Sequence, residues 1–88
     1  MQPFSYSNIV TNTTTVVKSG PGVLGTVTIN TTAAGIITIY DNTSAAGTKI
    51  ATIAASPVIG STFIYNVCFT TGLTIVTAAA SNITVSYY

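Results

Sequence analysis

The sequence predicts an all-β fold, an antiparallel β-sandwich or jelly roll of about seven to eight short strands. Apolar and polar side chains alternate along most of the 88 residues, which is the period of a β-strand and not of a helix. Turn-forming residues interrupt this alternation about every eight to twelve positions, as is typical of sandwiches and barrels. Threonine, whose branched side chain fits a pleated sheet, occupies 18 positions.

The pattern leaves the structure of the first segment open. In residues 1–12, the apolar side chains of Phe4, Tyr6 and Ile9 stand between polar neighbours, which fits either an eighth strand or an extended arm. We therefore expect an N-terminal arm or edge strand over residues 1–12, and a single sandwich domain over residues 13–88.

The first part of the domain contains three predicted strands. Thr13 to Lys18 is a short strand, which a turn of glycine and proline residues closes. Val23 to Asn30 alternates apolar and polar positions, so one of its faces is expected to be buried and the other wet. Ile36 to Asp41 follows, and the loop Asp41 to Gly47 is expected to hydrogen-bond its own backbone.

Four further strands are predicted in the second part. Thr48 to Ala55 has apolar side chains on both faces and is expected to lie centrally in a sheet or under a neighbour. Thr62 to Phe69 carries the heaviest apolar row and is expected to form the centre of the core. Leu73 to Ala78 and Asn82 to Tyr88 complete the domain. The predicted core consists of Val27, Ile29, Ile37, Ile39, Phe63, Tyr65, Val67, Phe69, Ile83 and Val85.

Charge is the most unusual feature of the composition. Lys18, Asp41 and Lys49 are the only charged side chains, and histidine is absent, whereas an average domain is about 25% charged. General acid–base catalysis needs histidine or paired carboxylates, so we do not expect an enzyme. Two lysines cannot form a basic groove, so nucleic acid is not an expected partner. Metal sites and small-molecule substrates are not expected either.

Two features could suggest chemistry but have simpler interpretations. Gly20, Gly22 and Gly25 match the dinucleotide-binding string G-x-G-x-x-G, but a strand follows them where the cofactor would need a helix. We interpret the string as a turn and expect no cofactor. The single cysteine, Cys68, lies within the heaviest predicted strand and is expected to be a buried, inert thiol.

Association with other chains is the expected function class. A domain of this size buries only about 60 to 65% of its unfolded surface, and so few charges favour contact between like molecules. Residues 1–17 lack the charged start and apolar run of a secretory signal, and no segment approaches about 20 apolar residues. We therefore expect no membrane segment and an intracellular site of assembly. Candidate interface residues are Phe4, Tyr6, Ile9, Tyr87 and Tyr88.

Three stretches of the sequence resemble small structural proteins of tailed bacteriophages and prophages. These are KSGPGVLGTVTINTTAAGIITIYDNTSAAGTKIATI from Lys18 to Ile53, TGLTIVT from Thr71 to Thr77, and NITVSYY from Asn82 to Tyr88. The resemblance implies a virion component without catalytic residues, and for a compact domain a capsid decoration (cement) protein. It further implies a homotrimer that binds the major capsid protein on the capsid surface and assembles in the host cytoplasm.

Three other functions are consistent with the sequence. The first is a neck or tail component of the same particle. The second is a carbohydrate-binding module that stacks sugars on Tyr40, Tyr65 or Tyr88. The third is a self-polymerising fibre subunit, which low charge and strand-rich sequence favour.

Overall fold

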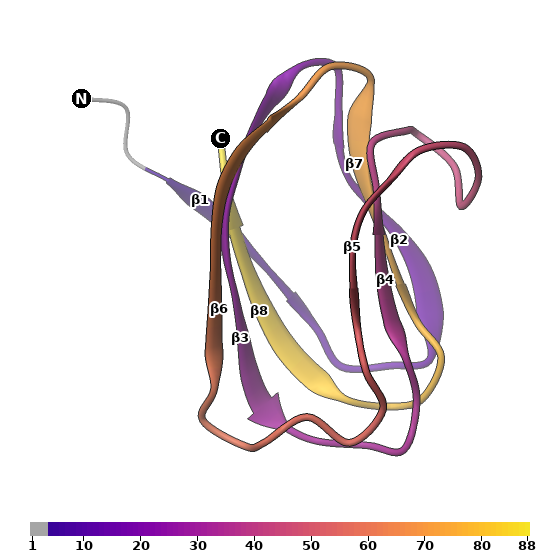
Figure 1. Ribbon diagram of the computed structural model, residues 1–88, viewed down its shortest axis with the longest axis vertical. Helices are drawn as coiled ribbons and strands as arrows, with labels where there is room; N and C mark the ends of the chain where they lie inside the picture. Colours follow the sequence, from indigo (N-terminus) through magenta and orange to yellow (C-terminus); the bar gives the residue numbers. More distant parts are fainter. Residues whose placement is uncertain (1–3) are drawn as a thin grey trace.

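The computed structural model describes residues 4–88, which form eight β-strands and no helix. The strands are β1 (Ser5–Ile9), β2 (Thr13–Ser19), β3 (Gly22–Thr31), β4 (Ile37–Tyr40), β5 (Lys49–Ile53), β6 (Thr62–Phe69), β7 (Gly72–Thr77) and β8 (Asn82–Tyr87). They form two antiparallel sheets of four strands, in the orders β1-β8-β3-β6 and β2-β7-β4-β5 (Figure 1). Buried apolar side chains fill the space between the sheets. The prediction of an antiparallel β-sandwich is confirmed.

The strand pairing is that of a jelly roll. β1 pairs with β8, β2 with β7, β3 with β6, and β4 with β5, as in one long hairpin that closes between β4 and β5. Rolling this hairpin adds the pairs β3–β8 and β4–β7, which complete the two sheets. As a result, consecutive strands mostly alternate between the sheets, and the first and last strands lie side by side.

The predicted strand boundaries agree with the structure to within two residues, and the bounds of β6 agree at both ends. The N-terminal segment, which the sequence pattern left open, forms the edge strand β1 over Ser5–Ile9. It lies flat against β8 of its own sheet and does not extend away from the domain. Residues 1–3 of that segment lie outside the described residues.

Most of the predicted core is buried. Seven of the ten predicted side chains are at most 1% exposed, namely Val27, Ile29, Ile37, Ile39, Phe69, Ile83 and Val85. The structure adds Ile9, Leu24, Ile53, Leu73 and Ile75 to this core. These additions come from both sheets, so the core is a continuous layer between them.

The prediction that β6 forms the centre of the core is wrong. β6 is an edge strand, so its inward-facing Phe63 and Tyr65 are only half-buried and Val67 is 37% exposed. The predicted central position of β5 is also wrong, because β5 lies at an edge of the other sheet. An edge strand has a neighbour on one side only, so its apolar side chains are less covered than the same side chains in a central strand.

The pairing of β3 with β6 contains a local irregularity. Leu24 pairs with Val67 and Thr26 with Ile64, so the single residue Gly25 of β3 lies opposite two residues of β6. One of these two is Asn66, which has a φ of 51°. The same residues of β3 mark a register shift against β8, and Leu24 and Val27 are both buried three positions apart. The alternation of inward and outward side chains is therefore interrupted in β3 and continues in β6, and a bulge of this kind bends the strand locally.

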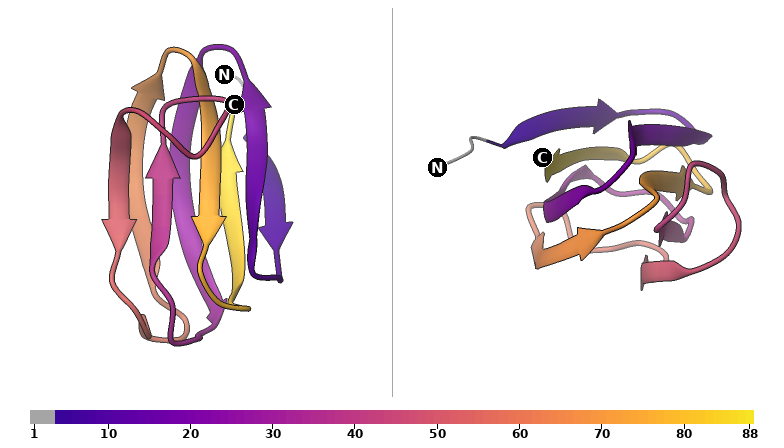
Figure 2. Two further views of the ribbon diagram at one scale, coloured as in Figure 1. Left: turned by 90° about the vertical axis from the view of Figure 1, so that its right-hand side faces the viewer. Right: turned by 90° about the horizontal axis from the view of Figure 1, so that it is seen from above.

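The strands of the sandwich are connected at two opposite ends (Figure 2), and these ends differ in the side chains that they carry. The connections β2–β3, β4–β5 and β6–β7 meet at one end, where Lys18, Asp41 and Lys49 all lie close to strand ends. The other connections meet at the opposite end, where the described residues carry no charge. Its loops expose Val10, Ile36, Val58 and Ile59. Among the described residues, all charged side chains therefore lie at one end of the sandwich.

Candidate interaction surface

The register determines which side chains of sheet β1-β8-β3-β6 point away from the core, because residues opposite each other in an antiparallel sheet share a face. Tyr6 of β1 lies opposite Ser86 of β8. Ser86 lies opposite Thr26 of β3, which lies opposite Ile64 of β6. We call this surface the outer face. It includes Phe4, Tyr6, Asn8, Thr26, Thr28, Asn30, Thr62, Ile64, Asn82, Thr84, Ser86 and Tyr88.

One half of the outer face is an ordered network of amides and hydroxyls. Asn8 Nδ2 donates to Asn82 Oδ1 at 2.7 Å and to the carbonyl oxygen of Ile83 at 2.8 Å. Asn30 Nδ2 donates to Thr84 Oγ1 at 2.9 Å and to Asn82 Oδ1 at 3.3 Å. These bonds join β1, β8 and β3 across the surface. They hold the polar side chains in fixed positions without any charge.

The other half of the outer face is aromatic. The ring of Phe4 packs edge-on against the ring of Tyr88, with centroids 4.7 Å apart and an interplanar angle of 79°. The Phe4 ring also lies over Gly25, where an added Cβ would come within 2.6 Å of Phe4 Cε2 and 2.8 Å of Ser86 Oγ. Glycine therefore leaves the space that the Phe4 ring occupies, and this contact holds the start of β1 on the sheet.

Large side chains at both margins of the outer face are exposed to solvent. Tyr6 on β1 is 74% exposed, Ile64 on β6 is 70% exposed, and Phe4 between them is 48% exposed. None of the side chains of the outer face is charged. Exposed aromatic and aliphatic groups without charge are the composition that protein–protein interfaces favour at their centres.

The structure brings together three of the five predicted interface residues and separates the other two. Phe4, Tyr6 and Tyr88 lie on the outer face. Ile9 is only 4% exposed and belongs to the core, so its assignment to the interface is wrong. It lies opposite Ile83, whose side chain points inward, because β1 is a strand of the sandwich and not a free arm. Tyr87 is partly buried and packs against the core.

Sequence reasoning missed Ile64, the second most exposed large apolar residue of the outer face. Ile64 stands between Phe63 and Tyr65, which the alternation assigns to the opposite face of the strand. A large aliphatic side chain on the polar side of an alternating strand was the available signal, because such a residue is costly to expose unless something covers it.

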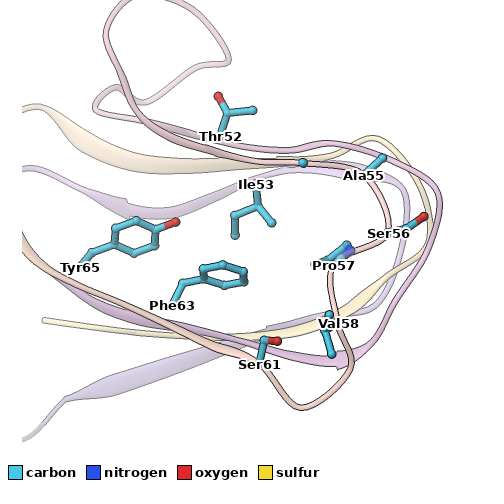
Figure 3. Close-up of a pocket in the computed structure, with 10 residues that line it drawn as sticks. Thr52, Ile53, Ala55, Ser56, Pro57, Val58, Ser61, Phe63 and Tyr65 are labelled. Carbon is cyan, nitrogen blue, oxygen red and sulfur yellow. The ribbon is translucent and has the colours of Figure 1, made fainter.

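A second surface is a groove between the edge strands β5 and β6, with a volume of about 510 Å³. Figure 3 shows Phe63 and Tyr65 of β6 pointing toward Ile53 of β5, with Pro57 and Val58 closing one end. Partial burial raises the pKa of the Tyr65 phenol, so that side chain remains neutral well above neutral pH. The groove is therefore uncharged. It is the open edge of the sandwich, where the two sheets part.

The only carboxylate side chain has a structural role. Asp41 Oδ1 accepts hydrogen bonds from the backbone N–H groups of Thr71 at 2.9 Å, Thr70 at 3.1 Å and Gly72 at 3.4 Å. These bonds lower the pKa of Asp41, because they favour the charged carboxylate. Asp41 thus fixes the β6–β7 turn. In the adjacent loop, Asn42 Nδ2 donates to the carbonyl oxygen of Ala46 at 2.8 Å, as the predicted self-bonded loop requires.

Two further features singled out in the sequence, the cysteine and the glycine string, lie within residues 4–88. Cys68 is exposed, so the prediction of a buried thiol is wrong. It lies opposite Val23 on the side of the edge strand β6 that faces away from the core. Gly22 and Gly25 lie within strand β3, with no helix after them, as expected for a turn followed by a strand. Within the described part of the chain, no group of histidine, cysteine and acidic residues could hold a metal ion.

Comparisons with known proteins yield no relative. No protein-family model, no curated protein and no solved structure matches this chain. A search of residues 4–88 for a helix long and apolar enough to cross a membrane likewise finds none.

Proposed function

We propose that this chain is a non-enzymatic structural protein of a tailed-phage virion, a capsid decoration or cement protein that binds the head shell and stabilises it. The observation that supports this proposal best is the outer face, where exposed Tyr6, Ile64 and Phe4 lie beside an ordered polar network without charge. A surface of this kind offers shape, apolar area and fixed hydrogen-bonding groups to another protein. It offers no group suited to catalysis.

The partners in this proposal are the major capsid protein and further copies of the chain itself. A trimer on the capsid surface is what the resemblance to small phage proteins implies. The jelly roll is an architecture that viral capsid proteins use repeatedly, which is consistent with the proposal at the level of fold analogy. Low charge also fits a protein that remains in a permanent assembly, because close packing of many copies then involves little repulsion.

Purified particles from cells that produce this chain provide the test. Quantitative mass spectrometry should detect the chain in the particles at hundreds of copies, comparable to the major capsid protein. A dozen copies or fewer would place it at the neck or tail instead, and absence from the particles would refute a virion role. Because Ile64 projects from the outer face, Ile64→Lys should lower the occupancy of the particles, and Lys49→Thr on the other sheet serves as the matched control.

A carbohydrate-binding module is the second candidate. Tyr6 is 74% exposed in the row next to the amide of Asn8, so an aromatic face and hydrogen-bonding groups lie on one surface. The tyrosines that the sequence suggested for this role, Tyr40, Tyr65 and Tyr88, are all partly buried. Binding of the isolated chain to a glycan array, lost in Tyr6→Ala, would favour this candidate over the capsid proposal.

A further inference from the structure

Three of the four edge strands carry a feature that discourages pairing with another chain. β2 contains Lys18 and a register shift after Val16. β5 contains Lys49 and a shift opposite Ile39 and Tyr40. β6 has no charge but contains the bulge at Asn66. Lysine side chains and bulges are the devices by which natural sheets protect the unpaired N–H and C=O groups of their edges.

β1 carries none of these features. Its register with β8 runs without a shift from Ser5 opposite Tyr87 to Ile9 opposite Ile83. It has no charged residue, no proline and no residue with a positive φ. It also contains Tyr6, the most exposed aromatic side chain of the described residues. Strand β1 is therefore a regular, unprotected edge that can pair with another β-strand.

We propose that the free edge of β1 pairs antiparallel with β1 of a second copy of this chain, about a two-fold axis through Ser7. This joins the two β1-β8-β3-β6 sheets into one sheet of eight strands. An antiparallel neighbour continues the alternation of the whole sheet, and a two-fold contact uses the same surface on both partners.

The side chains beside β1 complement one another in this register. With Ser7 opposite Ser7 of the second copy, Tyr6 lies opposite Asn8, and Phe4 lies opposite Val10. Phe4 is 48% exposed and Val10 is 51% exposed, so each apolar side chain would cover the other. No pair places like charges together, because the segment from Phe4 to Val10 has none. The second copy is the occupant that this self-complementary pattern favours.

The pairing also changes the geometry of the outer face. The two-fold axis is perpendicular to the sheet, so the outer faces of both copies point the same way. The dimer thus presents a doubled, continuous surface, and two linked surfaces bind a common support more tightly than one. This inference goes beyond the proposed function, because it holds whether or not the support is a phage head, and it replaces the trimer of that proposal with a two-fold dimer contact.

Sedimentation equilibrium of the purified chain and two matched variants tests the contact. Tyr6→Lys places a charge beside the β1 edge, and Ile64→Lys places the same charge on the same face at the opposite edge. Both positions are at least 70% exposed, so both variants should fold, which circular dichroism verifies. Tyr6→Lys should raise the dimer dissociation constant at least about tenfold, whereas Ile64→Lys should leave it unchanged.

Cysteine cross-linking tests the register, in a background where Cys68→Ser removes the exposed thiol. Residues opposite each other across an antiparallel pair have Cα atoms about 4.5 to 5.5 Å apart, within disulfide range. Ser7→Cys should therefore form a covalent dimer under mild oxidation. Tyr6→Cys should not, because its diagonal distance to the same residue of the partner is about 7 to 8 Å.

The sedimentation and cross-linking results together support or refute the β1 contact. A dimer weakened by Tyr6→Lys but not by Ile64→Lys, with selective cross-linking through Ser7→Cys, supports the contact. A chain that stays monomeric to millimolar concentration, or one whose association is equally lowered by Ile64→Lys, overturns it. Loss of particle occupancy in Ile64→Lys with an intact dimer would show that shell binding and the β1 contact are separate.

Discussion

The two sheets of this sandwich differ in the charge of their edge strands. Sheet β2-β7-β4-β5 has a lysine on each edge strand, Lys18 on β2 and Lys49 on β5. Sheet β1-β8-β3-β6 has no charged residue in any of its strands, and exposes Tyr6 and Ile64 at its margins. In a chain with only two lysines, we expect their positions to discourage pairing at the sheet that carries them. The uncharged sheet is the one that our proposal places in contact with a second copy.

The largest expected effect separates the centre of the uncharged sheet from its edge. Ile83 on the central strand β8 is fully buried, so Ile83→Ala should lower the free energy of unfolding by about 2 to 5 kcal/mol. Ile64→Ala on the edge strand β6 should change it by less than about 0.5 kcal/mol. Urea denaturation measures both. Similar losses at the two positions would mean that β6 is covered in solution and that the outer face is not open.

The next effect concerns the contact that holds β1 on the sheet. Gly25→Val should displace the Phe4 ring and lower the free energy of unfolding by about 1 to 3 kcal/mol, because its side chain would overlap that ring. Thr28→Val, on the same strand and face, serves as the control and should have a much smaller effect. An unchanged stability in Gly25→Val, with Phe4 still near Tyr88 by nuclear Overhauser contacts, would contradict the role given to glycine.

A further effect on the free energy of unfolding is expected only at acidic pH, and it tests the role of Asp41 at the charged end. The pKa of Asp41 is lowered in the folded chain, so its hydrogen bonds stabilise the fold above the unfolded pKa near 3.8. This contribution is lost as the pH falls through the folded pKa, where the carboxylate gains a proton. Denaturation curves between pH 6 and pH 2 should show a decline in the wild type that is reduced in Asp41→Asn. An equally steep decline in the variant would assign the acid sensitivity to another group.

The smallest expected effect on stability is the most informative about the two sheets. Replacing both Lys18 and Lys49 with threonine should change the free energy of unfolding by no more than about 0.5 kcal/mol, since neither lysine takes part in the core. The double variant should nevertheless form larger assemblies than the wild type, measured by light scattering at equal ionic strength, because two more edges are left without charge. Association identical to the wild type would show that the lysines do not protect the second sheet.

Local features of this fold could be predicted from the sequence because they depend on neighbouring residues. Alternation in Val23 to Asn30 and turn residues such as Gly20 and Pro21 determine where strands begin and end. The inward positions of the central strands follow from the same alternation. For this reason Ile29, Ile83 and the other residues of β3 and β8 predicted for the core are buried.

The order of the strands within each sheet could not be predicted in this way, because it depends on pairing between distant segments. The heavy apolar row of β6 suggested a central strand, yet β6 is at an edge and its row lines an open groove. The same limit explains Ile9, which becomes core only because β1 pairs with β8. Cys68 is a different case, because the alternation in β6 already places it on the face opposite to Phe63 and Phe69, and that face is exposed. The candidate surface was therefore found in part, through Phe4, Tyr6 and Tyr88.

Hydrogen exchange of the β1 backbone amides at increasing protein concentration tests the free β1 edge most directly. Amides of β1 that point away from β8 should become protected as the concentration rises through the dissociation constant, while those at the free edge of β6 should not change. Exchange at the β1 edge that stays equally fast at all concentrations would contradict the account, as would protection that rises at β6 instead.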